Sequence, residues 1–128
     1  MITNVRFASL YVRDQQKQLE FWADKLGCEV LLNAEYSEDD PSQRWIEVRP
    51  GKGETYLVIS PTSPEEESRI GGFSNIWFDC DDLEATYEDL KGKGVEFPVP
   101  PSDAPWAPGT KWAQFADPDG NLYGLSQR

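Results

Sequence analysis

The 128-residue sequence predicts an α+β fold built from two similar β-α-β-β-β modules. The main observation is that one order of patterns, a strand, a helix and three strands, occurs twice along the chain. A second is that the helical pattern of each half has matching start and stop signals. We therefore expect a single domain, with module one at residues 1–60, a linker at residues 61–72 and module two at residues 73–128.

Each module has one predicted helix, whose mostly apolar residues recur at helical spacing. The first helix has an N-cap at Asp14 and ends at Gly27; the second begins after Asp81 or Asp82 and ends near Gly94. The spaced residues are Leu19, Trp22, Ala23 and Leu26 in the first helix, and Leu83, Thr86, Tyr87 and Leu90 in the second.

Strands surround both helices, because β-branched and aromatic residues alternate with other residues there. The predicted strands are Val5–Val12, Cys28–Tyr36, Arg44–Arg49 and Thr55–Ser60 in module one, and Phe73–Cys80, Val95–Val99, Thr110–Ala116 and Leu122–Gln127 in module two. The last two strands of each module form a hairpin around turn residues. Residues 99–109 are expected to form a proline-rich loop with Trp106 at its tip.

The composition limits the partners of the protein. The formal net charge of −11 argues against nucleic acid and anionic membrane surfaces, and favours a cationic ligand or simple solubility. No apolar run is long enough to span a membrane, and the N-terminus lacks a signal-peptide pattern. Cys28 and Cys80 make no disulfide framework, so a reduced, cytoplasmic protein is expected.

Three segments resemble the vicinal oxygen chelate superfamily, which includes glyoxalase I, extradiol dioxygenases and bleomycin-resistance proteins. Phe115–Leu125, with Asp-Pro-Asp-Gly-Asn at its centre, resembles the last hairpin of that family. Asn75–Asp82 resembles its His-Ile-x-Phe-x-x-Asp-Asp motif, and Glu20–Gly27 its Glu-Phe-Trp-x-x-x-Leu-Gly helix. The resemblance covers nearly the whole chain, and implies that the tandem modules form a curved mixed-sheet cup with flanking helices.

The resemblance also shows where metal ligands belong. In metal-using members, two ligands come from each module, at positions that correspond here to Phe7, Val58, Asn75 and Gly124. The chain has no histidine at all. These four residues cannot assemble a transition-metal site, which needs imidazole, thiolate or carboxylate ligands. We therefore expect no metal and no cofactor.

Strand alternation separates a helix-facing set, which is almost wholly apolar, from an opposite face that carries the former metal positions. That face combines aromatic side chains with a few charges, which suits a planar or cationic organic ligand. The predicted ligand-binding residues, with Trp106 of the loop added, are Phe7, Tyr11, Trp45, Glu47, Tyr56, Asn75, Trp77, Asp79, Trp106 and Trp112. The alternative is that these aromatics pack the two half-sheets or a dimer interface, and both can be true.

The loop around Trp106 resembles the Pro-Trp-Gly loop of bleomycin-resistance proteins, which are metal-free, acidic homodimers that bind a bulky cationic drug. The resemblance implies a metal-independent binding protein, expected as a homodimer. A glyoxalase-like lyase or isomerase and a metabolite-binding regulatory domain remain alternatives. No catalytic residue is assigned, because neither Glu47 nor Asp79 has a partner at suitable spacing and no histidine can activate Cys28 or Cys80.

Overall fold

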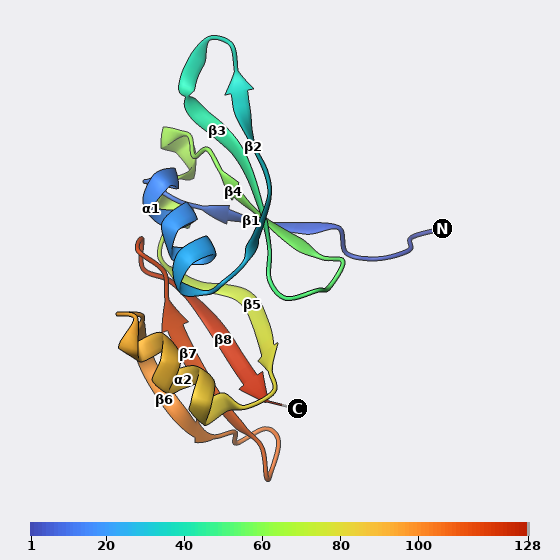
Figure 1. The fold of residues 1–128 in the computed structure, drawn as a ribbon, viewed down its shortest axis with the longest axis vertical. Helices are drawn as coiled ribbons and strands as arrows, with labels where there is room; N and C mark the ends of the chain where they lie inside the picture. The colour runs from blue at the N-terminus through green and yellow to red at the C-terminus, as the bar shows by residue number, and fades with distance from the viewer. Residues whose placement is uncertain (128) are drawn as a thin grey trace. The chain divides into compact units, whose positions relative to one another are not determined.

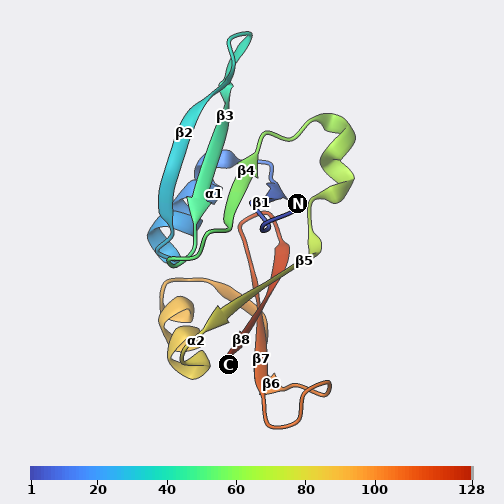
Figure 2. The same cartoon turned by 90° about the vertical axis from the view of Figure 1, so that its right-hand side faces the viewer.

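A computed structural model describes residues 1–127, and the chain divides into two compact units, Met1–Ile70 and the residues from Gly71 onward (Figures 1 and 2). Each unit has the predicted β-α-β-β-β order and a four-stranded sheet with one parallel pair of strands, so the α+β class is confirmed. None of the helices within residues 1–127 is long and apolar enough to cross a membrane.

The first unit has strand order β1-β4-β3-β2, with β1 parallel to β4 and the remaining pairs antiparallel. The predicted hairpin of β3 and β4 is present, and β3 begins four residues earlier than predicted because it also forms a hairpin with β2. The elements are β1 Phe7–Tyr11, α1 Gln15–Glu20, the π-helix η1 Phe21–Lys25, β2 Glu29–Ser37, β3 Asp40–Arg49, β4 Tyr56–Ser60 and the 3₁₀-helix η2 Pro64–Arg69.

The helix of the first unit begins as predicted, since the Asp14 side chain accepts a hydrogen bond from the backbone N–H of Lys17. It does not remain a regular α-helix, because its second half is the π-helix η1. Phe21 is therefore buried beside the predicted core residue Trp22, and the Trp22 indole N–H donates to the buried Gln18 at 2.9 Å. The regular 3.6-residue spacing of apolar residues does not predict a π-helix, whose turn is wider by a single residue.

The segment predicted as a linker packs on the first unit through η2. The backbone N–H of Val12 donates to the Thr62 hydroxyl at 3.0 Å, and Arg13 pairs with Glu67 at 2.6 Å. Ser63 donates from its backbone and hydroxyl to Glu66, which fixes the start of the 3₁₀-helix.

The second unit has strand order β5-β8-β7-β6, with β5 parallel to β8. Helix α2 packs against one face of this sheet (Figure 1), and its N-cap is Asp82, which accepts from the backbone N–H of Ala85. The elements are β5 Gly72–Cys80, α2 Leu83–Gly92, β6 Glu96–Asp103, β7 Lys111–Ala116 and β8 Asn121–Gln127.

One predicted boundary in this unit is wrong. The proline-rich segment continues strand β6 to Asp103, so the loop before β7 begins only at Ala104. Strand β6 lies at the edge of its sheet, where proline is tolerated because one side of the strand needs no donor. The residues of β6 in register with β7 are Glu96, Val99, Ser102 and Asp103, none of which is a proline.

The predicted helix-facing residues form most of the core of each unit. In the second unit Ala113, Phe115, Tyr123 and Leu125 are all buried beneath α2. In the first unit Leu10, Val12, Ile46, Val48, Leu57 and Ile59 are buried. The opposite face of each sheet, which we call its open face, is more exposed apart from buried positions such as Val58. The open faces carry the predicted binding residues other than Trp106, which lies in a loop.

Candidate ligand-binding surfaces

Three tryptophans meet on the open face of the second unit. Trp77 comes from β5, Trp112 from β7 and Trp106 from the loop between β6 and β7. Their ring centroids are 5.7 Å apart for Trp77 and Trp106, 5.8 Å for Trp77 and Trp112, and 5.3 Å for Trp106 and Trp112. We call these residues the tryptophan cluster. Trp77 is 46% exposed and Trp106 is 61% exposed, so the cluster offers ring surface to a ligand.

The position of Trp77 depends on Gly124, its partner across the β5–β8 ladder. A Cβ atom added to Gly124 would lie 2.4 Å from two carbon atoms of the Trp77 indole. The indole therefore lies directly against the backbone of β8, and any side chain at position 124 would displace it. The smallest residue is required here by packing, since the φ of Gly124 is not in the left-handed region.

Strand β5 contains a bulge that alternation alone does not predict. Phe73 is in register with Leu122 and Trp77 with Gly124, so four residues advance on β5 while two advance on β8. Asn75 lies in the bulge with a φ of 64°, a left-handed conformation that asparagine adopts more readily than most residues. The Ser74 hydroxyl closes the bulge by donating to the Leu122 carbonyl at 2.7 Å.

The side chains at the four former ligand positions do not fit a transition metal. Phe7 stacks on Tyr56, and Val58 is a fully buried aliphatic residue. The space in front of Gly124 is filled by the Trp77 ring, and Asn75 offers only a carboxamide. Within residues 1–127, no group of three or more histidine, cysteine, aspartate or glutamate side chains is arranged to hold an ion.

The first unit carries a second group of aromatic rings on its open face. The Phe7 ring stacks on Tyr56 at 5.5 Å and meets Trp45 edge-on at 6.2 Å. Tyr36, which is not among the predicted binding residues, stacks on Trp45 at 6.1 Å and is 55% exposed. Bulges in β2 disturb its alternation with β3, so the face of Tyr36 was not evident from the sequence.

The predicted charged and polar residues have different environments. Glu47 accepts a hydrogen bond from the Trp45 indole N–H at 3.0 Å, so its carboxylate is held beside the rings of the first unit. Asp79 is exposed on β5, two residues beyond Trp77. The Tyr11 hydroxyl accepts from Arg69 of η2 at 2.8 Å, and the Arg69 guanidinium lies over the Tyr11 ring at 5.2 Å.

Neither cysteine has the environment of a nucleophile. Burial raises the pKa of the Cys28 thiol from its ordinary value of 9.0 to about 11. Burial also raises the pKa of Cys80, with nearby aspartates adding to the effect. Both thiols are therefore protonated at neutral pH, whereas a reactive cysteine needs a thiolate.

The fold and the sequence together identify the protein family. Residues 4–125 match the model of the Glyoxalase/Bleomycin resistance protein/Dioxygenase superfamily. The chain belongs to this superfamily, which confirms the resemblance found in its sequence motifs.

Individual relatives share the whole length of the chain. It is 38% identical over 127 residues to the uncharacterized protein YetH of Bacillus subtilis (strain 168), covering 99% of this chain and 100% of that one. A superfamily member from Sphaerobacter thermophilus has a crystal structure with a TM-score of 0.84 and 32% identity, covering 99% and 98% of the two chains. The antibiotic binding protein TnmS3 from Streptomyces sp. CB03234 has a TM-score of 0.80 and 30% identity, covering 98% and 96%.

Proposed function

We propose that this protein is a metal-independent binding protein for a small aromatic cation, such as a toxic natural product or drug. The main support for this proposal is the exposed tryptophan cluster on the open face of the second unit. Contiguous apolar surface that is exposed to water usually marks a binding site. The adjoining, exposed rings of Trp77 and Trp106 form such a surface. Three indoles held at different angles offer both ring faces and ring edges to a planar ligand.

The preference for a cation rests on charge. The rings of the first unit lie beside Glu47, and Asp79 lies on the same strand as Trp77. A cation beside an indole gains from the negative face of the ring as well as from a nearby carboxylate. The relative TnmS3 is an antibiotic binding protein, which supports a natural product as the class of ligand.

Metal independence is supported by the Trp77–Gly124 pair. The indole occupies the space that a ligand side chain at position 124 needs, so the same feature removes a metal position and creates an aromatic surface. In the proposed mechanism the protein lowers the free concentration of its ligand by mass action, and no bond in the ligand is broken. The alternative of a glyoxalase-like lyase or isomerase predicts instead that the ligand is consumed.

We also propose how the protein assembles. We expect the two modules to form a single domain, and the chain to be a homodimer in the cytoplasm. Exposed apolar side chains at Val30, Leu31 and Leu32 of the edge strand β2 add to the exposed aromatic surface, and such patches favour association. Light scattering at micromolar concentration tests this, and a monomer would contradict it.

A thermal-shift screen tests the proposed function. Ligand binding to the native state raises the melting temperature. Planar aromatic cations such as proflavine should raise it more than neutral analogues such as acridone, and chromatography should recover each compound unchanged. Consumption of a compound would favour the enzyme alternative, and a preference for neutral analogues would contradict the cationic class.

A further inference from the structure

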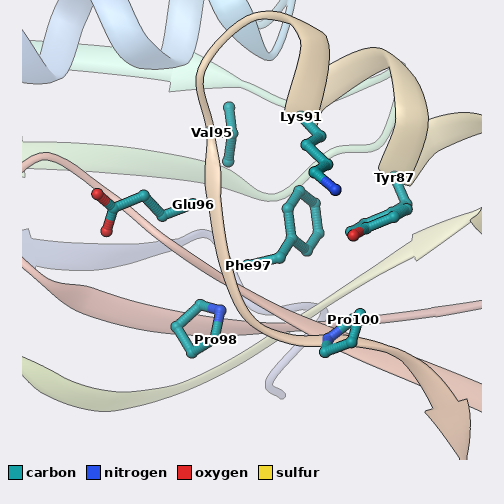
Figure 3. Close-up of a pocket in the computed structure, with 7 residues that line it drawn as sticks. All are labelled: Tyr87, Lys91, Val95, Glu96, Phe97, Pro98 and Pro100. Carbon is teal, nitrogen blue, oxygen red and sulfur yellow. The ribbon is translucent and has the colours of Figure 1, made fainter.

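A pocket on the helix-covered side of the second unit has no role in the proposed function. It lies between the second half of α2 and the beginning of β6, and has a volume of about 470 Å³ (Figure 3). That volume lies in the range of small-molecule sites. The lining residues are Tyr87, Lys91, Val95, Glu96, Phe97, Pro98 and Pro100.

The wall of the pocket is anchored to the core. The Phe97 ring meets Tyr87 edge-on at 4.9 Å and packs on the buried Phe115 at 6.1 Å. Val95 is 4% exposed, and its backbone N–H donates to the Leu90 carbonyl at the end of α2. The aromatic wall is therefore held in place by the same contacts that join α2 to β6.

Among residues 1–127, one cationic side chain lines the pocket. The Lys91 ammonium lies 5.3 Å from the centroid of the Tyr87 ring. Figure 3 shows this ammonium and the Tyr87 hydroxyl both beside Phe97, whereas the Glu96 carboxylate extends to the other side of the strand. Within residues 1–127 Lys91 forms no ion pair, while the neighbouring Lys93 pairs with Asp89 at 3.1 Å.

We propose that this pocket binds a small aromatic carboxylate. The ring of such a ligand would lie against Phe97 and the proline rim, and its carboxylate would accept hydrogen bonds from the Lys91 ammonium and the Tyr87 hydroxyl. An ammonium and a hydroxyl that line the same pocket as an apolar wall match a ring that carries a carboxylate, because the anion gains a charge-assisted bond while the ring leaves water. This ligand has the opposite charge to the one proposed for the tryptophan cluster, so the two sites are separable.

Titration with benzoate, followed by backbone amide chemical shifts, tests the proposal. Saturable shifts are expected at Val95, Glu96 and Phe97, and the neutral analogue benzyl alcohol should bind more weakly. Lys91→Gln should weaken benzoate binding by about fivefold or more, because the charged donor is lost. Lys93→Gln is the matched control, since it removes the same charge from the same helix end but does not line the pocket.

Three results of these titrations would overturn the proposed benzoate site. Equal weakening by Lys91→Gln and Lys93→Gln would show that benzoate responds only to general charge, and would overturn the site. Absence of saturable shifts at residues 95–97, or benzyl alcohol binding as tightly as benzoate, would also overturn it. Trp77→Ala should leave benzoate binding unchanged, so a failure of the proposed tryptophan site and a failure of this pocket give different results.

Discussion

Gly124 determines what the open face of the second module can do. With no side chain at that position, the Trp77 indole lies against the backbone of β8 and joins Trp106 and Trp112. A carboxylate there, as in metal-using relatives of the family, would need the space that the indole fills. The chemistry of this face therefore depends on the Trp77–Gly124 pair, and changing that pair alone would leave Phe7, Val58 and Asn75 at the other three ligand positions.

The first prediction is that Gly124→Ala disrupts the tryptophan cluster. The added methyl group overlaps the Trp77 ring, and such overpacking costs about 1–3 kcal/mol. We expect a lower free energy of unfolding in urea and a changed near-ultraviolet circular dichroism signal from tryptophan. Gly53→Ala is the control, because within residues 1–127 no atom beyond its two chain neighbours lies within 4 Å of its Cβ position. Equal stability of the two variants would show that the indole moves aside without cost.

The second prediction concerns Cys28, whose pKa is raised by burial from 9.0 to about 11. Between these values the unfolded chain loses the thiol proton while the folded chain keeps it. The unfolded state then binds fewer protons, so the free energy of unfolding should fall as pH rises from 9 to 11. Urea titrations across this range should show a smaller fall for Cys28→Ala. An identical fall in the variant would mean that Cys28 is accessible to water.

At the scale of elements, the last hairpin is held by one buried side chain. Asp117 accepts hydrogen bonds from the backbone N–H groups of Asp119 and Asn121, from the Asn121 side chain, and from the Tyr123 hydroxyl at 2.7 Å. Asn121 in turn accepts from the backbone N–H of Gly71, which ties the start of β5 to the hairpin. The Asp-Pro-Asp-Gly-Asn turn thus fixes the β8 strand on which Trp77 rests.

The third prediction is that Asp117→Ala destabilises the protein more than Tyr123→Phe. The first change removes the acceptor of four hydrogen bonds, three of them buried, at a cost of roughly 2–4 kcal/mol, whereas the second removes one hydrogen bond worth about 1 kcal/mol. Urea unfolding measures both values. If the two variants were equally stable, the Asp117 network would not be what holds the hairpin.

The sequence predicts elements whose signals are local. The helix cap at Asp14, a cap at Asp81 or Asp82, and the order of strands were evident, because caps and alternation depend on neighbouring residues. The structure identifies Asp82 as the second cap. The bulge at Asn75 and the extension of β6 to Asp103 were not, since they depend on pairing with distant strands.

The candidate sites likewise combine features set by neighbouring residues, which the sequence predicts, with features set by distant segments, which it does not. Alternation placed Trp77 and Trp112 on one face, where the structure brings them together. Tyr36 was missed because bulges interrupt the alternation of β2. The pocket around Lys91 and Phe97 was missed because a helix and a strand contribute to it jointly, and no sequence motif records that contact.

At the scale of the whole molecule, the net charge of −11 attracts cations without any specific site. The fourth prediction separates this general attraction from binding at the aromatic faces. Asp79→Asn and Glu47→Gln keep the shape of each side chain and should weaken binding of a planar cation such as proflavine by ~1–3 kcal/mol where the carboxylate contacts it. Binding of neutral acridone should barely change. General attraction would instead give weak, non-saturable binding that disappears with salt and ignores both substitutions.

Metal-independent binding at the tryptophan cluster is best tested by calorimetric titration with proflavine. The wild type and Trp77→Ala are compared after dialysis against a chelator. The wild type should bind saturably without metal, and Trp77→Ala should bind about tenfold more weakly, because it loses ring contact and buried area together. Trp77→Phe should retain part of the affinity, since a ring remains against Gly124. Wild-type binding that requires an added metal ion, or unchanged affinity in Trp77→Ala, would contradict a metal-independent site at the tryptophan cluster.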